Sequence, residues 1–445
     1  MRTATPENRD LTQGSIYRQL IRIGIPAALG MVFNTLYNLT DNWFAGQISD
    51  VALSGLSIAS IVFAMFLSLG MGLQSGTSAM VAADLGNRND DQVRNWINCS
   101  LGITFFLSVL ILVLGLVFGL PLLQTLSETP EVVTVAWEYT WVILFANVFF
   151  NITSCFAGAL IAHGNTKSYR NILIFGFFAN WLFNPLFIFV FDFGVAGLAW
   201  STAIIKLGSS LYLWRVLQQE VGYWAKPQVD WGHWLQMLKQ IMPASMNMLT
   251  IIICGFITIY FISQFGDEPV AGYSVGLRIE QVLLLPALGL NAAMLALGGQ
   301  NFGVDQYQRI RDAYHKALKL GVVVTVGMVP GMVFASPWLV NSFSDTESVA
   351  TVGVSYMRID AIAFFAYVVL FISVGTLQSI KQPNFPMILG VFRQILVPVG
   401  IYYLLVMYWD FGVNSLFYAL VGVVTISAVI LYFYTNKQLK KLINS

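Results

Sequence analysis

The sequence predicts an all-α polytopic membrane protein with 12 transmembrane helices in two six-helix lobes. Three observations lead to this fold class: a scarcity of charge, long apolar segments along the whole chain, and similarity between its two halves. Hydrophobic residues make up 57% of the 445 residues, against 23 Lys and Arg and 22 Asp and Glu. A soluble domain could not cover its surface with so few charges, and a disordered chain is far less apolar.

Charge and motifs also exclude several functions. A net charge of +1 provides no basic surface for nucleic acid. The chain contains no GxxxxGK[ST] phosphate loop and no HExxH or GxSxG motif, so neither an ATP-driven pump acting alone nor an enzyme is expected. Its three histidines and three cysteines have no metal-ligand spacing. We therefore expect no catalytic residue, no metal and no cofactor other than a coupling ion.

Apolar runs of roughly 20 to 28 residues recur along the chain, each long enough to cross about 30 Å of hydrocarbon. Strands of a membrane barrel are much shorter and alternate strictly, so a barrel is excluded. The expected helices cover residues 18–46, 51–82, 96–122, 134–162, 168–192, 194–217, 236–264, 269–299, 313–340, 351–380, 384–408 and 411–435.

The distribution of Lys and Arg predicts the orientation of these helices. The two termini and alternate loops hold 19 of the 23 cations, whereas the opposite loops hold only acidic residues. Because Lys and Arg are retained on the cytoplasmic side, we expect both termini to lie in the cytoplasm of a bacterial cell, with the chain in its inner membrane.

A fixed offset relates the two halves of the chain. Pro26 corresponds to Pro243, and 243 − 26 = 217; the same offset pairs Arg94 with Arg311 and Gly158 with Gly375. Since six helices are an even number, the halves run in the same direction and are expected to be related by a pseudo-two-fold axis along the membrane normal. The expected domains are an amino-terminal lobe (1–217), a cytoplasmic linker (218–235) and a carboxyl-terminal lobe (236–445).

Polar residues inside the apolar segments are candidate functional groups, because a charge at bilayer depth is costly. Asn34, Tyr37 and Asp41 share one stripe of the first helix, and Asn180 and Asn184 share one face of the fifth. With Thr202 of the sixth helix they lie at similar depth, where they could hold a hard cation or a titrating acid. A hydrogen-bonded structural acid is the alternative for Asp41.

Two further features could serve transport or structure. Pro26 interrupts the hydrogen bonding of the first helix and could act as a hinge. In the second half, Arg278, Glu280 and Asp360 could form a polar network, for example through an Arg278–Asp360 pair, and a structural role is favoured there.

Four segments resemble the multidrug and toxic compound extrusion (MATE) family. They are IPAALGMVFNTLYNLTDNWFAGQISDVALSGLSIA at 25–59, GLRIEQVLLLPALGLNAAMLALGGQNFG at 276–303, GALIAHGNTK at 158–167 and GTLQSIKQPN at 375–384. The resemblance covers nearly the whole chain and has both DinF-like and NorM-like features. It implies a pair of lobes that export amphipathic, often cationic, compounds in exchange for protons or sodium ions.

Matched residue by residue, the resemblance assigns roles to the polar groups. It implies a kink in the first helix at Pro26 and an essential carboxylate at Asp41. The cation and substrate cavity would contain Asn34, Tyr37, Tyr139, Asn180 and Thr202. DinF-like members often have Asp where this chain has Asn184, and the NorM-like acids of helices 7 and 10 correspond to Thr250 and Tyr367.

The resulting hypothesis is a secondary active exporter of drugs and small organic cations, driven by H⁺ or, alternatively, Na⁺. The chain would work as a monomer in the lipid bilayer. Aromatic and amide side chains would complete the substrate cavity, namely Tyr37, Asn147, Phe150 and Trp181. A flippase of a lipid-linked precursor is the alternative, but a cavity for anionic carriers should contain several cations, and this lobe offers only Lys206.

Overall fold

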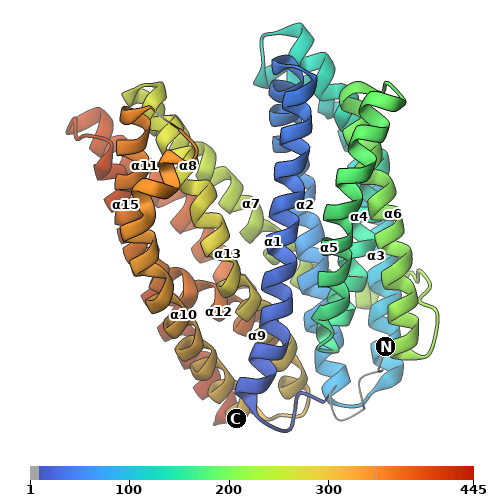
Figure 1. Cartoon of the computed structure of the whole chain (residues 1–445). Coiled ribbons are helices and arrows are strands. Elements are labelled where there is room, and N and C mark those ends of the chain that lie inside the picture. Colours follow the sequence, from blue (N-terminus) through green and yellow to red (C-terminus); the bar gives the residue numbers. More distant parts are fainter. Residues whose placement is uncertain (1–9, 345, 445) are drawn as a thin grey trace. The chain divides into compact units, whose positions relative to one another are not determined.

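The computed structural model describes residues 10–344 and 346–444, and all regular elements within them are helical (Figure 1). The first half contains α1 (Ile16–Ile48), α2 (Asp50–Gly86), α3 (Asp90–Leu126), α4 (Pro130–Ala162), α5 (Thr166–Pro185) and α6 (Gly194–Val221). The second half contains α7 (Trp231–Ile262), α8 (Asp267–Leu283), α9 (Leu285–Gly303), α10 (Tyr307–Asn341), α11 (Glu347–Asp360), α12 (Phe364–Ser379), α13 (Asn384–Val391), α14 (Val397–Tyr403) and α15 (Asn414–Ile443). A 3-10 turn (Ser263–Phe265) ends α7, another (Ala361–Ala363) joins α11 to α12, and π-helical turns cover Leu186–Val190, Phe392–Leu396 and Leu404–Tyr408.

Every expected transmembrane range corresponds to helix in the structure. Among the described residues, ten helical segments are long and apolar enough to span a membrane, and the bent pair α8–α9 makes an eleventh. The remaining expected span, 194–217, is α6, which does not meet this criterion. Lys206 lies in the middle of α6, next to a run of small polar residues that lowers its hydropathy.

The internal repeat is visible in the bounds of the helices. The central helix α4 starts at Pro130 and its counterpart α11 starts at Glu347, and 347 − 130 = 217. The same offset relates α2, Asp50–Gly86, to the pair α8–α9, which covers Asp267–Gly303. The pair is bent by 41° at Leu284, whereas α2 is continuous. Pro286 follows this break where the first half has Leu69, and proline cannot donate the backbone hydrogen bond that would continue the helix.

The chain forms two compact units that differ in their bounds from the expected lobes. Of the described residues, the first comprises 10 and 29–245, and the second comprises 11–28, 246–344 and 346–444. The start of α1 therefore belongs to the second unit, and the start of α7 belongs to the first. The two segments that belong to the other half's unit end at Ala28 and Ser245, which are again 217 residues apart (245 − 28).

Close packing explains why the beginning of α1 belongs to the second unit. A Cβ on Gly24 would lie 3.3 Å from the carbonyl oxygen of Gly289, so the absence of both side chains lets α1 approach α9. Nearby, the backbone N–H of Leu11 donates to Gln300 (2.9 Å), and Asn301 donates to the Leu11 carbonyl (3.1 Å). In the first unit, a Cβ on Gly72 would lie 2.6 Å from the carbonyl oxygen of Ile241, so glycine at this position lets α2 pack closely against the start of α7.

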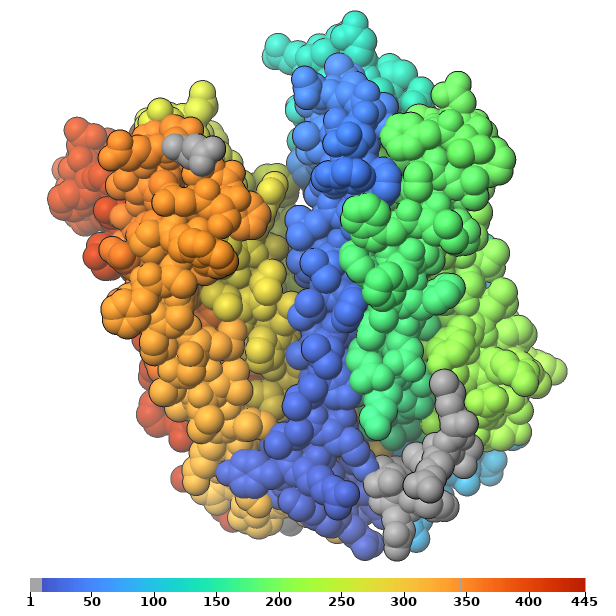
Figure 2. All heavy atoms as spheres, in the orientation of Figure 1, coloured from blue at the N-terminus to red at the C-terminus, as the bar shows by residue number. Residues whose placement is uncertain are grey.

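The exposed surface is apolar along the membrane-spanning helices. On α1 the exposed side chains recur at helical spacing and include Tyr17, Ile21, Ile25, Leu29, Leu36, Leu39 and Trp43. In Figure 2, α1 and α5 lie at the surface of the molecule, with no other part of the chain in front of them. The apolar side chains on this surface are therefore exposed. Helices with an apolar outer face need lipid rather than water around them. The protein is a multi-pass membrane protein.

Between α6 and α7, the part of the expected linker that is not helical covers residues 222–230. It packs on α3, because Asn98 accepts hydrogen bonds from the backbone N–H groups of Lys226 (3.0 Å) and Gln228 (3.1 Å). Asp230 then caps the start of α7 by accepting from the backbone N–H of His233 (3.1 Å). The linker is thus fixed against the first unit.

Candidate functional site

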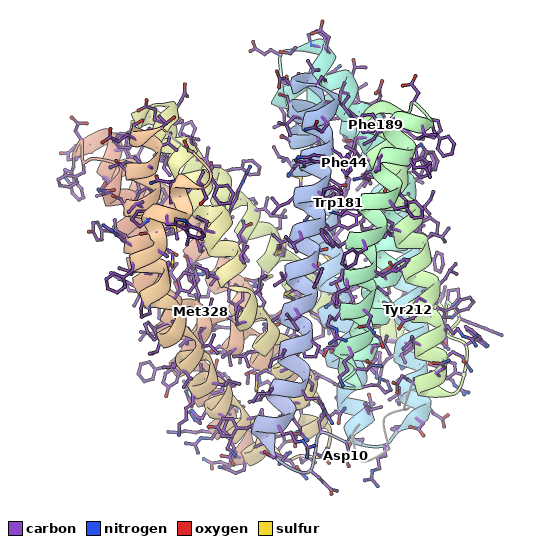
Figure 3. The ribbon with its side chains drawn as sticks, in the orientation of Figure 1. Asp10, Phe44, Trp181, Phe189, Tyr212 and Met328 are labelled. Carbon is purple, nitrogen blue, oxygen red and sulfur yellow. The ribbon has the colours of Figure 1, made fainter. Side chains whose placement is uncertain are left out.

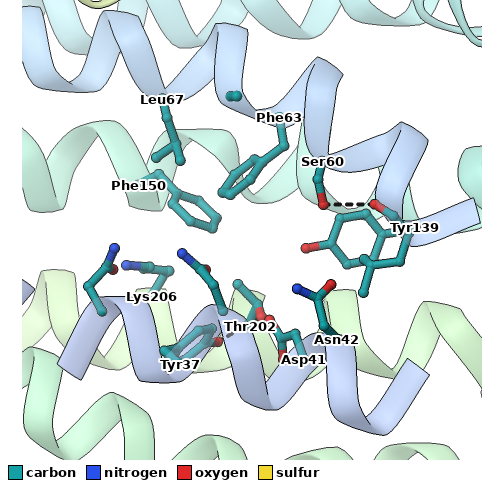
Figure 4. Close-up of a pocket in the computed structure, with 14 residues that line it drawn as sticks. Tyr37, Asp41, Asn42, Ser60, Phe63, Leu67, Tyr139, Phe150, Thr202 and Lys206 are labelled. Atoms are coloured by element: carbon teal, nitrogen blue, oxygen red, sulfur yellow. Dashed lines mark hydrogen bonds between the residues drawn. The ribbon is translucent and has the colours of Figure 1, made fainter. Parts of the chain in front are cut away.

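A polar cavity of about 290 Å³ lies within the first unit, between α1, α2, α4 and α6 (Figure 4). The helical repeat turns one stripe of α1 toward it, which carries Asn34, Tyr37 and Asp41. The apolar wall comes mainly from α2, where Leu56, Phe63 and Leu67 recur at helical spacing. The described residues that line it are Asn34, Tyr37, Asn38, Asp41, Asn42, Leu56, Ser60, Phe63, Ala64, Leu67, Tyr139, Phe150, Thr202 and Lys206.

Asp41 is a buried acid held by two amides of α5. Its side chain is 6% exposed, and its Oδ1 accepts hydrogen bonds from Asn180 (2.8 Å) and Asn184 (2.9 Å). The two asparagines are one helical turn apart, and Asn184 also donates to the Oδ1 of Asn180 (2.9 Å). The other Asp41 oxygen, Oδ2, accepts no hydrogen bond from a described residue. Since Asp41 lines the cavity, Oδ2 is the oxygen that a proton or cation can reach.

The backbone of α5 changes next to this cluster. Pro185 ends α5, and a π-helical turn over Leu186–Val190 follows directly. The amide oxygen of Asn184 is fully buried and has no hydrogen-bond partner among the described residues. A buried acceptor without a donor is unusual in a folded protein, and π-helical turns are frequent at functional sites. Both features mark the Asp41 cluster as a site rather than as ordinary packing.

Among the described residues, Lys206 is the one cation in the cavity lining, and it does not neutralise the acid. Its Nζ lies 5.0 Å from the centre of the Phe150 ring, and no ion pair joins it to Asp41 in the described part of the chain. On the preceding turn of α6, Thr202 shares a hydrogen bond of 2.7 Å with the Tyr37 hydroxyl. The site therefore contains a separated acid and base, with polar and aromatic groups around them.

Most of the residues expected from the sequence meet at this site. Six of them line the cavity: Asn34, Tyr37, Asp41, Tyr139, Phe150 and Thr202. Asn180 and Asn184 do not line it but donate hydrogen bonds to Asp41. Sequence reasoning missed the contribution of α2 and the amides of Asn38 and Asn42. A signal for the amides existed, since Asn34, Asn38 and Asn42 are spaced at i, i+4 and i+8 on α1.

Two expected cavity residues lie elsewhere. Trp181 is 46% exposed and packs on Trp43 and Phe44, with ring centres 5.5 Å away from each (Figure 3). Each helical position is turned by about 100° from the previous one, so Trp181 cannot face the side on which its neighbour Asn180 meets Asp41. Asn147 donates to the Ser108 carbonyl (3.2 Å) and lines a small adjoining cavity of about 20 Å³, which shares Phe63, Leu67 and Phe150 with the first.

Pro26 does not break the first helix, because α1 is continuous from Ile16 to Ile48. Its position is nevertheless special. The chain passes from the second unit to the first between Ala28 and Leu29, within one helical turn of Pro26. The same holds for Pro243 and the boundary between Ser245 and Met246 in α7.

The acidic residues of the second half form a cluster with tyrosines rather than with Arg278. Glu280 and Asp360 are 5% and 1% exposed, and they accept hydrogen bonds from Tyr356 and Tyr367 respectively. Arg278 is exposed on α8 and forms no ion pair with a described residue, so the expected Arg278–Asp360 pair is wrong. Two positions along an α-helix differ by about 200° in direction, which separates Arg278 from the face of Glu280. No group of three His, Cys, Asp or Glu side chains in the described residues could hold a metal ion.

A polar cavity with a buried acid among helices of a multi-pass membrane protein is typical of membrane transport proteins. The sequence pattern of the MatE family matches residues 26–186 and, a second time, residues 243–404. The chain therefore belongs to the MatE family, the transporter family that its motifs resemble, and it is not an enzyme. The two matches begin 217 residues apart (243 − 26), in agreement with the internal repeat.

Relatives and solved structures agree with this assignment. The chain is 26% identical over 305 residues, 68% of each chain, to a Bacillus subtilis protein named "Probable multidrug resistance protein YpnP". It is 22% identical over 401 residues, 88% of each chain, to a Shewanella oneidensis protein named "FAD transporter". A solved multidrug resistance MATE family transporter of the MOP superfamily, in an outward-facing conformation, superimposes with a TM-score of 0.92 at 22% identity over 99% of both chains. The fold is that of MATE transporters.

Proposed function

We propose that the protein exports amphipathic organic cations from a bacterial cell in exchange for inward protons. The observation that carries this proposal is Asp41, a buried carboxylate with one oxygen free toward a cavity and no ion-pair partner among the described residues. An anion in this position attracts a cation, and a proton on the same oxygen removes the attraction. Cation and proton then exclude each other, which is the requirement for exchange.

The cavity walls suit amphipathic substrates. Tyr37, Tyr139, Phe63 and Phe150 offer aromatic surface, and the polar groups between them are adaptable amides. Organic cations gain affinity from aromatic faces without a fixed pattern of hydrogen bonds. All these residues belong to one unit of one chain, which supports a functional monomer. Relatives that carry multidrug resistance names are consistent with such substrates.

Protons are preferred over sodium ions as the coupling ion because of the ligand set. Asn184 stands where a second carboxylate would help to neutralise Na⁺, so Asp41 is the single acid that lines the cavity in the described part of the chain. Sodium binding usually recruits several oxygen ligands, whereas the nitrogens of Asn180 and Asn184 point at Asp41. Ethidium transport by purified protein in liposomes, driven by a sodium gradient at equal pH on both sides, would contradict proton coupling.

Transport of a lipid-linked precursor or of an anionic nucleotide is the alternative. The Shewanella oneidensis relative is named an FAD transporter, and FAD carries phosphates. The Asp41 cavity argues against such cargo in this unit, since it holds an acid without an ion-pair partner among the described residues, and such an acid repels phosphates.

Ethidium efflux from cells that lack their own exporters tests the proposal. Wild-type protein should lower cellular ethidium, and Asp41→Asn should not, because the amide keeps the shape of the side chain but can neither attract a cation nor release a proton. Asp192→Asn is a suitable control: it removes an exposed acid at a position with φ of 56°, which Asn tolerates as well as Asp. Equal efflux by wild type and Asp41→Asn at equal expression would refute the assignment.

We also propose that both termini lie in the cytoplasm, as the distribution of Lys and Arg predicts. A reporter that is active only in the cytoplasm, fused after the carboxyl terminus, should be active. An inactive reporter at equal expression would contradict a cytoplasmic carboxyl terminus.

A further inference from the structure

A second cavity, of about 410 Å³, lies wholly within the second unit. Residues of α7, α8, α11, α12, α13 and α15 line it together with the π-helical turn over Phe392–Leu396. Most of its wall is apolar, with Met248, Ile252, Phe256, Leu277, Leu370 and Phe371 among the lining residues. It shares no residue with the Asp41 cavity. The apolar wall can accommodate the body of an amphipathic molecule.

Arg393 gives this cavity a charge without a counter-ion. It belongs to a membrane-spanning segment, Asn384–Tyr408, and its side chain lines the cavity. Within the described residues its guanidinium forms no ion pair and donates no hydrogen bond. Arg carries five N–H donors and stays charged, so an Arg at this depth without an acceptor is costly. An anion in the cavity would remove that cost.

Two amides could add donors beside the guanidinium. Gln394, next to Arg393 in the chain, accepts from the Thr250 hydroxyl through Oε1, and its amide nitrogen donates to no described residue. The side-chain amide of Asn247 makes no hydrogen bond with a described residue either, and both residues line the cavity. A Cβ built on Gly390 would lie 3.0 Å from Asn247 Oδ1 and 3.8 Å from Gln394 Oε1. Glycine at this position therefore allows both amides to gather around one turn of α13.

The acids of this unit do not serve as the missing counter-ion. Glu280 lines the same cavity, but it accepts a hydrogen bond from Tyr356 and is not ion-paired with Arg393 in the described structure. Asp360 accepts from Tyr367 (3.3 Å) and does not line the cavity. The two acids are thus supplied with tyrosine donors, while the guanidinium and both amides are left without acceptors.

We propose that this cavity is a binding site for an amphipathic organic anion, whose carboxylate, sulfonate or phosphate group is bound by Arg393 with Asn247 and Gln394. The apolar walls hold the rest of the molecule. The site goes beyond the proposed cation export, because it lies in the other unit and because its charged group without a partner among the described residues is a cation, Arg393, rather than an acid. A dissolved anion or the headgroup of an anionic lipid would supply the same chemistry. Arg binds such groups through two parallel hydrogen bonds.

Three probes with the same fluorescent body test the charge preference. Dansylglycine is an anion, dansylamide is neutral and dansylcholine is a cation, and dansyl fluorescence rises in an apolar site. With wild-type protein in phosphatidylcholine nanodiscs, we expect dansylglycine to bind the second unit about tenfold more tightly than dansylamide. This comparison needs no variant. Equal affinity for the two probes would overturn the proposal.

Variants then assign the preference to Arg393. Arg393→Gln should weaken dansylglycine binding about tenfold and leave dansylcholine binding unchanged. Arg393→Lys keeps the charge but loses the planar fork, so its affinity for dansylglycine should lie between those of wild type and Arg393→Gln. Arg358→Gln is the matched control, since Arg358 is an exposed arginine of the same unit outside the cavity. Undiminished dansylglycine binding by folded Arg393→Gln protein would refute the site.

Two further arms separate this proposal from the first one and identify the source of the anion. Asp41→Asn should retain dansylglycine binding even if it abolishes cation efflux, so that either proposal can fail alone. Adding phosphatidylglycerol to the nanodiscs should weaken dansylglycine binding if a lipid headgroup occupies the site, and leave it unchanged if the ligand is a dissolved anion. Competition that persists in Arg393→Gln would contradict a headgroup bound by Arg393.

Discussion

Asn184 allows a quantitative test of how Asp41 is tuned. Its amide donates to Asp41 Oδ1 (2.9 Å) and to Asn180 (2.9 Å), and its side chain is fully buried. A hydrogen bond to a charged group contributes about 1.5–3 kcal/mol, against about 0.5–1.5 kcal/mol for a neutral one. Asn184→Ala therefore removes about 1–1.5 kcal/mol more from the charged form of Asp41 than from its protonated form.

This difference corresponds to about one pH unit, since one unit equals about 1.4 kcal/mol. The direction of the shift follows from the loss of the Asn184 amide as a hydrogen-bond donor. Without it the charged form of Asp41 is less stable, so Asp41 binds its proton at a higher pH. Titration of ethidium binding to purified protein should show affinity falling as the pH is lowered, with the midpoint about one unit higher in Asn184→Ala than in wild type.

Asn151→Ala is the matched control for this titration. Asn151 is also a buried asparagine of the first unit that donates two hydrogen bonds, to Ser108 (3.0 Å) and Asn147 (3.1 Å), and it does not contact Asp41. Its loss should cost stability without moving the midpoint. A midpoint that is unchanged in Asn184→Ala, or equally shifted in both variants, would refute the reasoning.

Three further predictions follow from other parts of the structure. Lys206→Gln frees the face of Phe150 for an organic cation and should tighten ethidium binding about two- to fivefold, from about 0.5–1 kcal/mol of cation–π attraction; unchanged or weaker binding in calorimetry contradicts this role. Pro26→Ala and Pro243→Ala each restore a helix hydrogen bond next to a boundary between the units, so both should slow transport in liposomes without altering ethidium affinity, and unaltered rates would exclude hinges. The backbone N–H of His233, and then its side chain, hold the pKa of Asp230 below its usual value. Asp230 therefore stabilises α7 fully when the pH is above that usual pKa, and this stabilisation is lost as the pH falls through the lowered pKa. Asp230→Ala should lower the melting temperature most at neutral pH, and a decrease that is the same at every pH would contradict the cap.

The fold class and the amino-terminal site were predictable because they depend on local patterns. Long apolar runs set the spans, and the positions of Asn34, Tyr37 and Asp41 on one helical stripe placed them on one face. The bend between α8 and α9 depends on a proline in a repeat that is otherwise regular, and it could have been read from the alignment of Pro286 with Leu69.

Features that depend on packing between distant segments were not predictable. The transfer of residues 11–28 to the second unit arises from the fit of Gly24 on Gly289, and a single sequence does not show which glycines meet. Trp181 was misplaced because aromatic character alone does not reveal which helix face is turned to a cavity. The Arg393 cavity was not predicted because its residues are spread over six helices and a π-helical turn and share no spacing.

Proton release on substrate binding tests the central claim most directly. If ethidium and a proton compete for Asp41, adding ethidium to purified wild-type protein in weakly buffered solution should release protons, detected by a pH dye, near the midpoint of the binding titration. Asp41→Asn protein should release none, and Asn151→Ala protein should release as many as wild type. Binding of ethidium to wild-type protein without any proton release across this pH range would contradict exchange at Asp41.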